Sequence, residues 1–256
     1  MKGFKAVFKR EMYAFFASPV FYVVGTIFLI LSGYFFYTST AYFSLISFQA
    51  AQNPYAGQQV NLNEMVVKPL FDDLSIILLL IVPLLTMRLL AEEKKNGTIE
   101  LLLTYPVREL AVLLGKYLAT LLVIVLLLAF TAVNIFVISR FGVVDWGPVL
   151  SGYSGMVLMA AGFVSLGLFT SALTQNQIVA AILGFGALLM FWIIGWIGSV
   201  SGPGIGQVVN YLSMLEHLEP FTKGVLDSRD IMYYFNFSLF FIFLTLRYLD
   251  SQKIRG

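Results

Sequence analysis

Apolar runs long enough to cross a membrane alternate with short polar stretches along most of the chain. The runs predict six transmembrane helices, at about residues 20–43, 72–90, 110–139, 149–173, 178–200 and 230–249. About 20 apolar residues, rising 1.5 Å each, cross the ~30 Å hydrocarbon core of a bilayer. A backbone within lipid satisfies its own hydrogen bonds as helix. The pattern therefore predicts an all-α membrane protein, with residues 1–256 forming a single transmembrane domain.

The chain begins with a shorter amphipathic stretch, predicted as an interfacial helix over residues 3–17. Its apolar positions recur near the helical period, at Phe4, Val7, Phe8, Phe15 and Phe16. The basic residues lie elsewhere on the helical wheel, at Lys2, Lys5, Lys9 and Arg10. Such a helix lies in the membrane interface with its basic side toward anionic headgroups. A signal peptide is the competing interpretation, which Glu11 and the long basic lead disfavour.

The polar stretches between the apolar runs predict loops and short helices. Residues 44–71 are rich in Gln and Asn and contain Asn53-Pro54, Gly57 and Pro69, which favours an exposed loop, with or without a short helix. Residues 140–148 and 174–177 read as turns, and residues 201–229 as an outer, amphipathic segment that does not span. Pro83 within the second span predicts a kink.

The positions of the charges predict the orientation of the helices. One set of connectors and both terminal segments hold most of the cations: Lys2, Lys5, Lys9, Arg10, Arg88, Lys94, Lys95, Arg108, Lys116, Arg247, Lys253 and Arg255. The opposite side holds Lys68, Arg140, Lys223 and Arg229. Because cytoplasmic loops carry the excess of Lys and Arg, both termini are expected in the cytoplasm of a bacterial cell, with the helices crossing its cytoplasmic membrane. The net charge of +2 gives no reason to expect nucleic acid.

The connector between the second and third spans is the most informative stretch. Asn96-Gly97 predicts the end of one helix, because Gly adopts the left-handed conformation at low cost. Thr98 then caps a new helix with Glu100 in its first turn, and Pro106 ends it. The helix carries many apolar groups for a connector: Ile99, Leu101, Leu102, Leu103 and Tyr105. They either lie flat on lipid or fill a groove on a partner protein.

A resemblance to a known protein family favours the second alternative, a groove on a partner protein. The run from Met87 to Val107, followed by Leu114-Gly115-Lys116-Tyr117, resembles the signature of type-two ATP-binding-cassette (ABC) exporter permeases. The resemblance implies a cytoplasmic coupling helix over residues 97–106 that docks on a separate ATPase subunit. Its docking residues would be Thr98, Ile99, Glu100, Leu101, Leu102, Leu103, Thr104 and Tyr105. Glu92 or Glu93 would make a cytoplasmic polar contact, with Gly97 and Pro106 as supporting residues at the helix ends.

The same resemblance implies the other parts of the complex. ATP and Mg²⁺ would be bound by the partner ATPase, and six spans would be completed by a second copy or a related permease. A further stretch, from Leu215 to Asp230, resembles permeases associated with gliding motility more than those of copper-enzyme maturation. The expected function is a permease subunit of an ABC transporter with an unidentified substrate. The alternative is an ABC-type membrane component that does mechanical or assembly work on the cell envelope, with an auxiliary envelope subunit as a further partner.

The sequence indicates no catalytic, cofactor-binding or metal site in this chain. No G-x-x-x-x-G-K-[ST] phosphate loop is present, so ATP hydrolysis is assigned to the partner, and no catalytic or cofactor-binding residue is expected. The chain has no cysteine, and a metal site would need more ligands than the single histidine, His217, and its neighbours supply. His217 is therefore expected to be an interfacial polar residue. The spans carry no charged residues near their middles, which disfavours a proton-coupled or sodium-coupled carrier.

Overall fold

The computed structural model describes residues 2–52, 61–98, 109–200 and 204–255, and these residues are almost entirely helical. The helices in chain order are α1 (Lys2–Ala17), α2 (Pro19–Gln52), η2 (Asn63–Val67), α3 (Lys68–Thr86), α4 (Arg88–Lys95), α6 (Glu109–Ile138), α7 (Trp146–Leu173), α8 (Gln177–Val200), α9 (Ile205–Leu212), α10 (Met214–Thr222) and α11 (Ser228–Arg255). Six helical segments among the described residues are long and apolar enough to cross a membrane, namely Pro19–Gln52, Asn63–Lys95, Glu109–Ile138, Trp146–Leu173, Gln177–Trp196 and Ser228–Gln252. The predicted all-α class with six spanning helices is confirmed.

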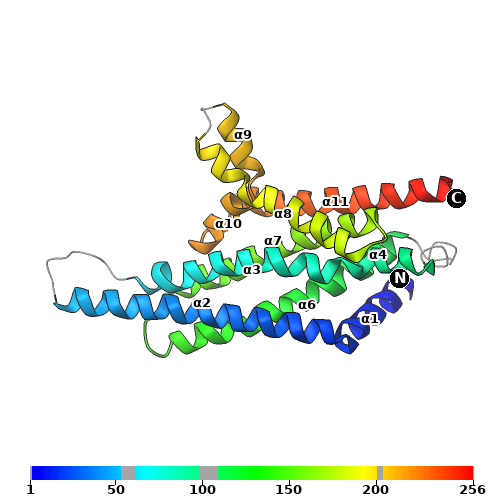
Figure 1. Cartoon of the computed structure of the whole chain (residues 1–256). Coiled ribbons are helices and arrows are strands. Elements are labelled where there is room, and N and C mark those ends of the chain that lie inside the picture. The colour runs from blue at the N-terminus through cyan, green and yellow to red at the C-terminus, as the bar shows by residue number, and fades with distance from the viewer. Residues whose placement is uncertain (1, 53–60, 99–108, 201–203, 256) are drawn as a thin grey trace.

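The bundle is built around α3 and α7, the most buried of the six apolar helices (Figure 1). Glycines on α7 let neighbouring helices approach closely. A Cβ at Gly152 would lie 2.3 Å from the Phe71 ring, and one at Gly155 would lie 2.7 Å from Phe221 of α10. Small residues are the usual means of close helix packing in membranes, where lipid removes the hydrophobic drive for association. The remaining helices present large apolar side chains outward.

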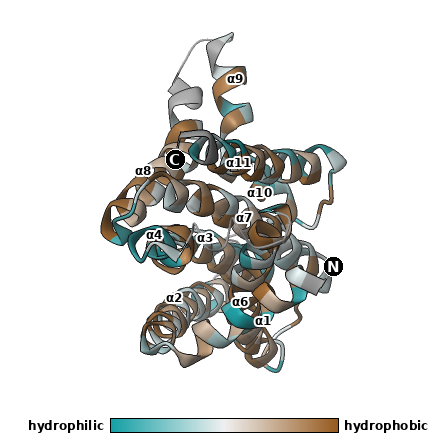
Figure 2. Ribbon diagram, turned by 90° about the vertical axis from the view of Figure 1, so that its right-hand side faces the viewer, coloured by the Kyte–Doolittle hydropathy of each residue, from teal (hydrophilic) through white to brown (hydrophobic). Residues whose placement is uncertain are grey.

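Both ends of the chain lie at the same end of the bundle, together with α1 and α4 (Figure 1). We call this the α1 end, and the other the opposite end. Figure 2 looks onto the α1 end, where hydrophilic residues lie on α4 and near α1. The opposite end carries α10, which reaches the start of α3 through an ion pair of 3.7 Å between Lys68 Nζ and Glu219 Oε1.

The stretch predicted as a loop from residue 44 is largely helical. Residues 44–52 contain neither Gly nor Pro, so α2 continues to Gln52, directly before Asn53-Pro54. After residues 53–60, which lie outside the described residues, the π-helical turn η2 leads into α3. Pro69 lies in the first turn of α3, directly after the π-helical turn η2. The position of Pro69 therefore did not indicate a loop.

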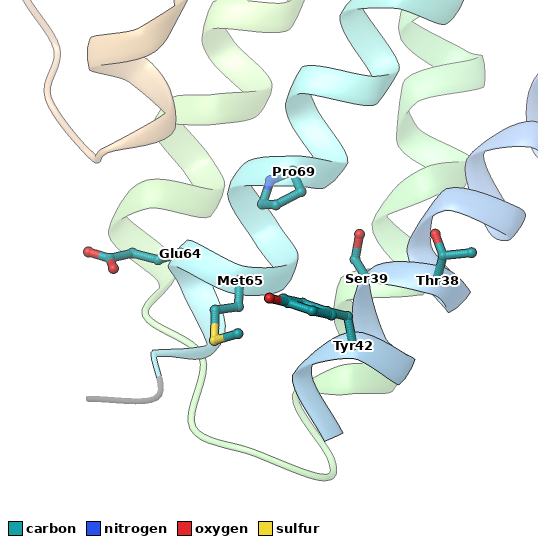
Figure 3. Close-up of a pocket in the computed structure, with 6 residues that line it drawn as sticks. All are labelled: Thr38, Ser39, Tyr42, Glu64, Met65 and Pro69. Atoms are coloured by element: carbon teal, nitrogen blue, oxygen red, sulfur yellow. The ribbon is translucent and has the colours of Figure 1, made fainter. Parts of the chain in front are cut away.

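A hollow of about 410 Å³ lies between α2 and the η2–α3 segment, and Figure 3 shows its lining. The residues that line it are Thr38, Ser39, Tyr42, Glu64, Met65 and Pro69. Tyr42 and Met65 face one another across the hollow, while the Glu64 carboxylate points away from Tyr42. None of the predicted site residues lies here.

Candidate functional site

The predicted docking residues fall almost wholly outside the described residues, which resume at Glu109 after Thr98. Ile99 to Tyr105 and the supporting Pro106 therefore stay predictions. Thr98 is exposed, and its Oγ1 donates to the Glu93 backbone carbonyl at 3.2 Å. The structure thus describes both helices that flank the connector, α4 and α6, at the α1 end.

The end of α4 has the geometry predicted for Asn96-Gly97. The Asn96 N–H bonds to Glu92 O at 3.0 Å, and the Gly97 N–H bonds to Lys94 O at 3.2 Å. Gly97 has φ of 67°, the left-handed conformation that costs glycine least. The direction in which the chain leaves α4 is therefore fixed by local backbone geometry. Glu92 is exposed, whereas Glu93 turns inward.

Four charged side chains from three helices meet beside this point, and we call them the ion cluster: Arg10, Glu11, Glu93 and Lys116. Lys116 lies in the second turn of α6 with its side chain only 1% exposed. Its Nζ lies 2.8 Å from Glu11 Oε1 of α1 and 2.9 Å from Glu93 Oε1 of α4. One ammonium group thereby ties α1 and α4 to α6.

Arg10 completes the ion cluster from the water side. Its Nη2 donates to Glu11 Oε1 at 2.9 Å and to Glu93 Oε1, while half of its side chain stays exposed. Two cations and two carboxylates give a cluster of zero net charge. Buried charges are tolerated only when they are paired and hydrogen-bonded, and the ion cluster gives the buried Lys116 two carboxylate partners.

The pKa values of the α1 members fit this arrangement. Burial acts to raise the pKa of Glu11, but attraction to Lys116 and the hydrogen bonds from Lys116 and Arg10 outweigh it, so the pKa lies below the ordinary 4.5. Burial acts to lower the pKa of Arg10, and its bonds to Glu11 and Glu93 raise it overall. Both groups are therefore charged at neutral pH.

The start of α4 is also held by α7. Ser171 Oγ accepts from the Leu90 and Ala91 N–H groups at 3.0 and 3.1 Å, and it donates to Met87 O at 2.9 Å. These bonds lie where α3 gives way to α4, one turn after Pro83. A side chain inserted into the helical ladder is a recognised cause of such breaks.

Two further contacts hold the ends of α4. The Arg88 guanidinium lies 4.7 Å from the Phe15 ring centroid of α1, a cation–π distance. Lys94 Nζ donates to Ala172 O and lies 4.6 Å from the Tyr248 ring centroid of α11. The segment before the connector is thus fastened to α1, α7 and α11 at once.

Sequence reasoning did not anticipate the ion cluster. It gave Glu92 or Glu93 a polar contact, but it placed Arg10 toward headgroups and Lys116 among the cations on the side of the termini, and it gave Glu11 no partner. Glu11 and Lys116 lie 105 positions apart, so no local pattern joins them. The sequence offered two signals of the ion cluster. Glu11 is the one acidic residue in a basic helix, and Lys116 is a lysine inside an apolar run.

The fold and this site define the chain as a multi-pass helical membrane protein with most of its Lys and Arg residues at one end. Residues 5–249 match the family described as ABC-2 family transporter protein, and the chain belongs to that family. The family makes it a permease component of an ABC transporter, and implies an ATPase partner and dimeric assembly in general. None of the curated proteins compared with the chain matches it.

Proposed function

We propose that the chain couples ATP hydrolysis by a separate subunit to the movement of a substrate across the bacterial cytoplasmic membrane, with residues 97–106 as the docking helix. In this proposal the α1 end faces the cytoplasm. ATP and Mg²⁺ bind to the partner ATPase, and a second permease copy or a related permease completes the assembly. The resemblance of residues 215–230 to gliding-motility permeases concerns the final use of the transport, and the coupling does not require it.

The observation that carries the proposal is the double ion pair of Lys116. The connector leaves α4 at Gly97 and joins α6 at Glu109. Because Lys116 bonds to Glu93 of α4 and to Glu11 of α1, a force on the connector acts on three helices together. Without these bonds, each helix would respond separately to a force on the connector. Part of the connector's displacement would then not reach α1 and α6.

The break between α3 and α4 is the point at which α4 can change its tilt relative to α3. α3 is fixed in the core, whereas α4 is a short helix held by Ser171 at its start and by Lys94 at its end. A ligand shifts a conformational equilibrium only by its differential affinity for the two states. The ATPase would therefore favour one tilt of α4 by docking more tightly in one nucleotide state.

Two variants separate docking from transmission. L102D/L103D puts carboxylates on the docking face, so the ATPase is expected to be lost from the purified complex. K116M leaves the connector intact but removes the link between α1, α4 and α6. The ATPase should remain bound, while the ATP-dependent change in distance between spin labels on α1 and α10 disappears. The absence of native cysteines allows such labels to be placed at single sites.

The controls are an exposed lysine and a milder change in the ion cluster. K5M removes a cation from the exposed side of α1 and should keep both binding and the distance change. E93Q keeps a hydrogen-bond acceptor but loses the charge, and it should reduce the distance change. Retention of the ATPase by L102D/L103D would refute the docking helix, and an unchanged distance response in K116M would refute transmission through the ion cluster.

A further inference from the structure

Helix α2 packs on the bundle with one narrow face, whose buried residues are Val24, Gly25, Phe28 and Ser32. The other side of the helix is exposed over almost its whole length, and a row of its positions recurs in alternating steps of three and four residues. These positions, which we call the α2 stripe, are Val20, Val23, Ile27, Ile30, Tyr34, Tyr37, Ala41, Ser44 and Phe48. All are exposed except Ala41, which is half-buried.

The spacing of the α2 stripe is that of a helix that packs along another helix. Alternating steps of three and four residues make a seven-residue repeat, which keeps one row of side chains facing a partner in a left-handed coiled coil. The exposed apolar row of α6 has steps of four, four, four, three and four residues, at Leu118, Leu122, Leu126, Phe130, Val133 and Val137. The repeat on α2 therefore indicates a helical partner, whereas the row on α6 shows no such repeat.

The outer end of the α2 stripe extends beyond the turn that joins α6 to α7. Asn63 is level with that turn, because its Nδ2 donates to Asp145 O at 2.8 Å and its Oδ1 accepts from the Asp145 N–H at 3.0 Å. Met65, two residues later, faces Tyr42 of α2 (Figure 3). Phe48 lies six residues beyond Tyr42, about 9 Å further along the helix, and is 65% exposed. Acyl chains end near a turn between spans, so the stripe continues where lipid does not cover it.

The chemistry of the α2 stripe suits contact with an identical stripe. Two copies of a membrane protein share one orientation, so a two-fold axis between them is perpendicular to the membrane and each residue on it meets its own counterpart. A charged residue would meet a like charge there, and α2 contains no Asp, Glu, Lys, Arg or His. α8 is also uncharged, but no residue between Leu183 and Met190 is exposed, so its outward face is interrupted.

The exposed area of the α2 stripe is large enough for a stable dimer. Its nine positions together expose on the order of 800 Å² per copy, which is the area that each partner buries in an interface of standard size. Within lipid, helices associate through close packing, and the β-branched side chains of Val20, Val23, Ile27 and Ile30 have few rotamers to lose.

We propose that the α2 stripe is the seam on which a second copy of this chain packs, with the two α2 helices parallel about a two-fold axis. The inference rests on the part of the proposed function that places a second permease beside this one, and it makes that permease an identical chain.

The seam is tested by cross-linking single cysteines in the full chain, which has none of its own. A disulfide needs Cβ atoms about 3.5–4.5 Å apart, so only positions near the axis can link to their own counterparts. Oxidation in lipid vesicles should convert I27C and Y34C into covalent dimers. Y22C and L29C, exposed on α2 outside the stripe, are the matched controls and should stay monomeric. The yield should hold when the lipid-to-protein ratio is raised, because a stable seam, unlike random collision, survives dilution.

A second measurement uses a pair of tryptophan substitutions at equally exposed positions. Ile27 in the α2 stripe is 49% exposed and Leu183 on α8 is 46% exposed, so an indole fits in lipid at either place. In the dimer, I27W overpacks the seam. The dissociation constant of the dimer, measured by energy transfer between labelled copies as lipid is added, should rise at least about tenfold in I27W and stay unchanged in L183W.

Three results would overturn the seam. One is equal cross-linking at Ile27, Tyr34, Tyr22 and Leu29, which would mean random collision. Another is a chain that stays monomeric in lipid without a different permease, which would make the partner a related chain. The third is cross-linking of M190C on α8 with none at the stripe. These measurements use the chain without its ATPase, so their failure leaves the docking of residues 97–106 to be judged by L102D/L103D alone.

Discussion

Lys116 shows how one residue can join distant parts of a membrane protein. An ammonium group moved from water into the interior loses solvation worth several kcal/mol, which only close, hydrogen-bonded partners offset. Glu11 and Glu93 lie within 2.9 Å and supply this compensation. A cation with a side chain of this length is therefore needed at position 116. A substitution of Lys116 affects the packing of α1, α4 and α6.

K116M is expected to lower the free energy of unfolding by about 3–5 kcal/mol, because it leaves two buried carboxylates with Arg10 as their remaining cation. Thermal or denaturant unfolding of the detergent-solubilised chain measures the loss. K5M, at an exposed position, should change the stability by no more than about 0.5 kcal/mol. Equal losses in K116M and K5M would mean that the ion cluster adds no stability.

Gly97 gives a prediction that depends on backbone conformation alone. Its φ of 67° disfavours residues with a Cβ by roughly 1–2 kcal/mol, and no atom lies within 4 Å of an added Cβ. G97A should lower stability by about that amount and G97N by less, because Asn tolerates the left-handed region. In G33A, also without a neighbour within 4 Å, alanine fits the helix, and stability should hold or rise. A cost for G33A equal to that for G97A would contradict this explanation.

At the scale of the element, α1 is held to the bundle by a contact that depends on pH. The pKa of Glu11 is lowered in the folded protein, so its contribution to stability is present above the ordinary value of 4.5 and is lost as pH falls through the folded pKa. Acidification below about pH 4.5 should loosen α1. A spin label at the exposed Ala14 should become more mobile, whereas in E11Q its mobility should not change between neutral and acidic pH.

The contact of α7 with α3 gives a second prediction at this scale. A Cβ at Gly167 would lie 2.2 Å from Thr86 Oγ1, which is itself fixed by a 2.9 Å bond to Val82 O. G167A should therefore push the two central helices apart and cost about 1–3 kcal/mol, as overpacking does in other cores. G186A, on α8 with open space around the position, is the control and should be near neutral. Similar unfolding temperatures for the two variants would show that α3 and α7 can separate freely.

The same elements show what the sequence could and could not predict. Helix positions followed from the lengths of apolar runs, and the end of α4 followed from Asn96-Gly97, because both depend on neighbouring residues. The helical extension of α2 past residue 44 was missed because polar composition outweighed the lack of helix breakers. The ion cluster and the burial of His217 depend on how helices pack, and no spacing within one helix records that. His217 lies in α10 and is 4% exposed, so the expectation of an interfacial position was wrong.

At the scale of the whole molecule, charge separates the two ends of the bundle. Twelve of the 16 Lys and Arg residues belong to the terminal segments and to connectors on their side, and the α1 end holds both termini (Figure 1). In multi-pass membrane proteins the excess of Lys and Arg lies in the cytoplasm. The proposed coupling also requires this orientation, because ATP is available to the partner ATPase on that side.

The orientation is tested by labelling single cysteines in intact cells with a membrane-impermeant thiol reagent. Tyr13, 77% exposed on α1, and Val225, 54% exposed after α10, lie at the two ends. We expect V225C to react in intact cells and Y13C to react after permeabilisation. The reverse result would place the connector outside the cell, away from ATP, and no role of residues 97–106 in docking an ATPase could survive it. Labelling of both before permeabilisation would instead indicate leaky cells, which a cytosolic marker protein detects.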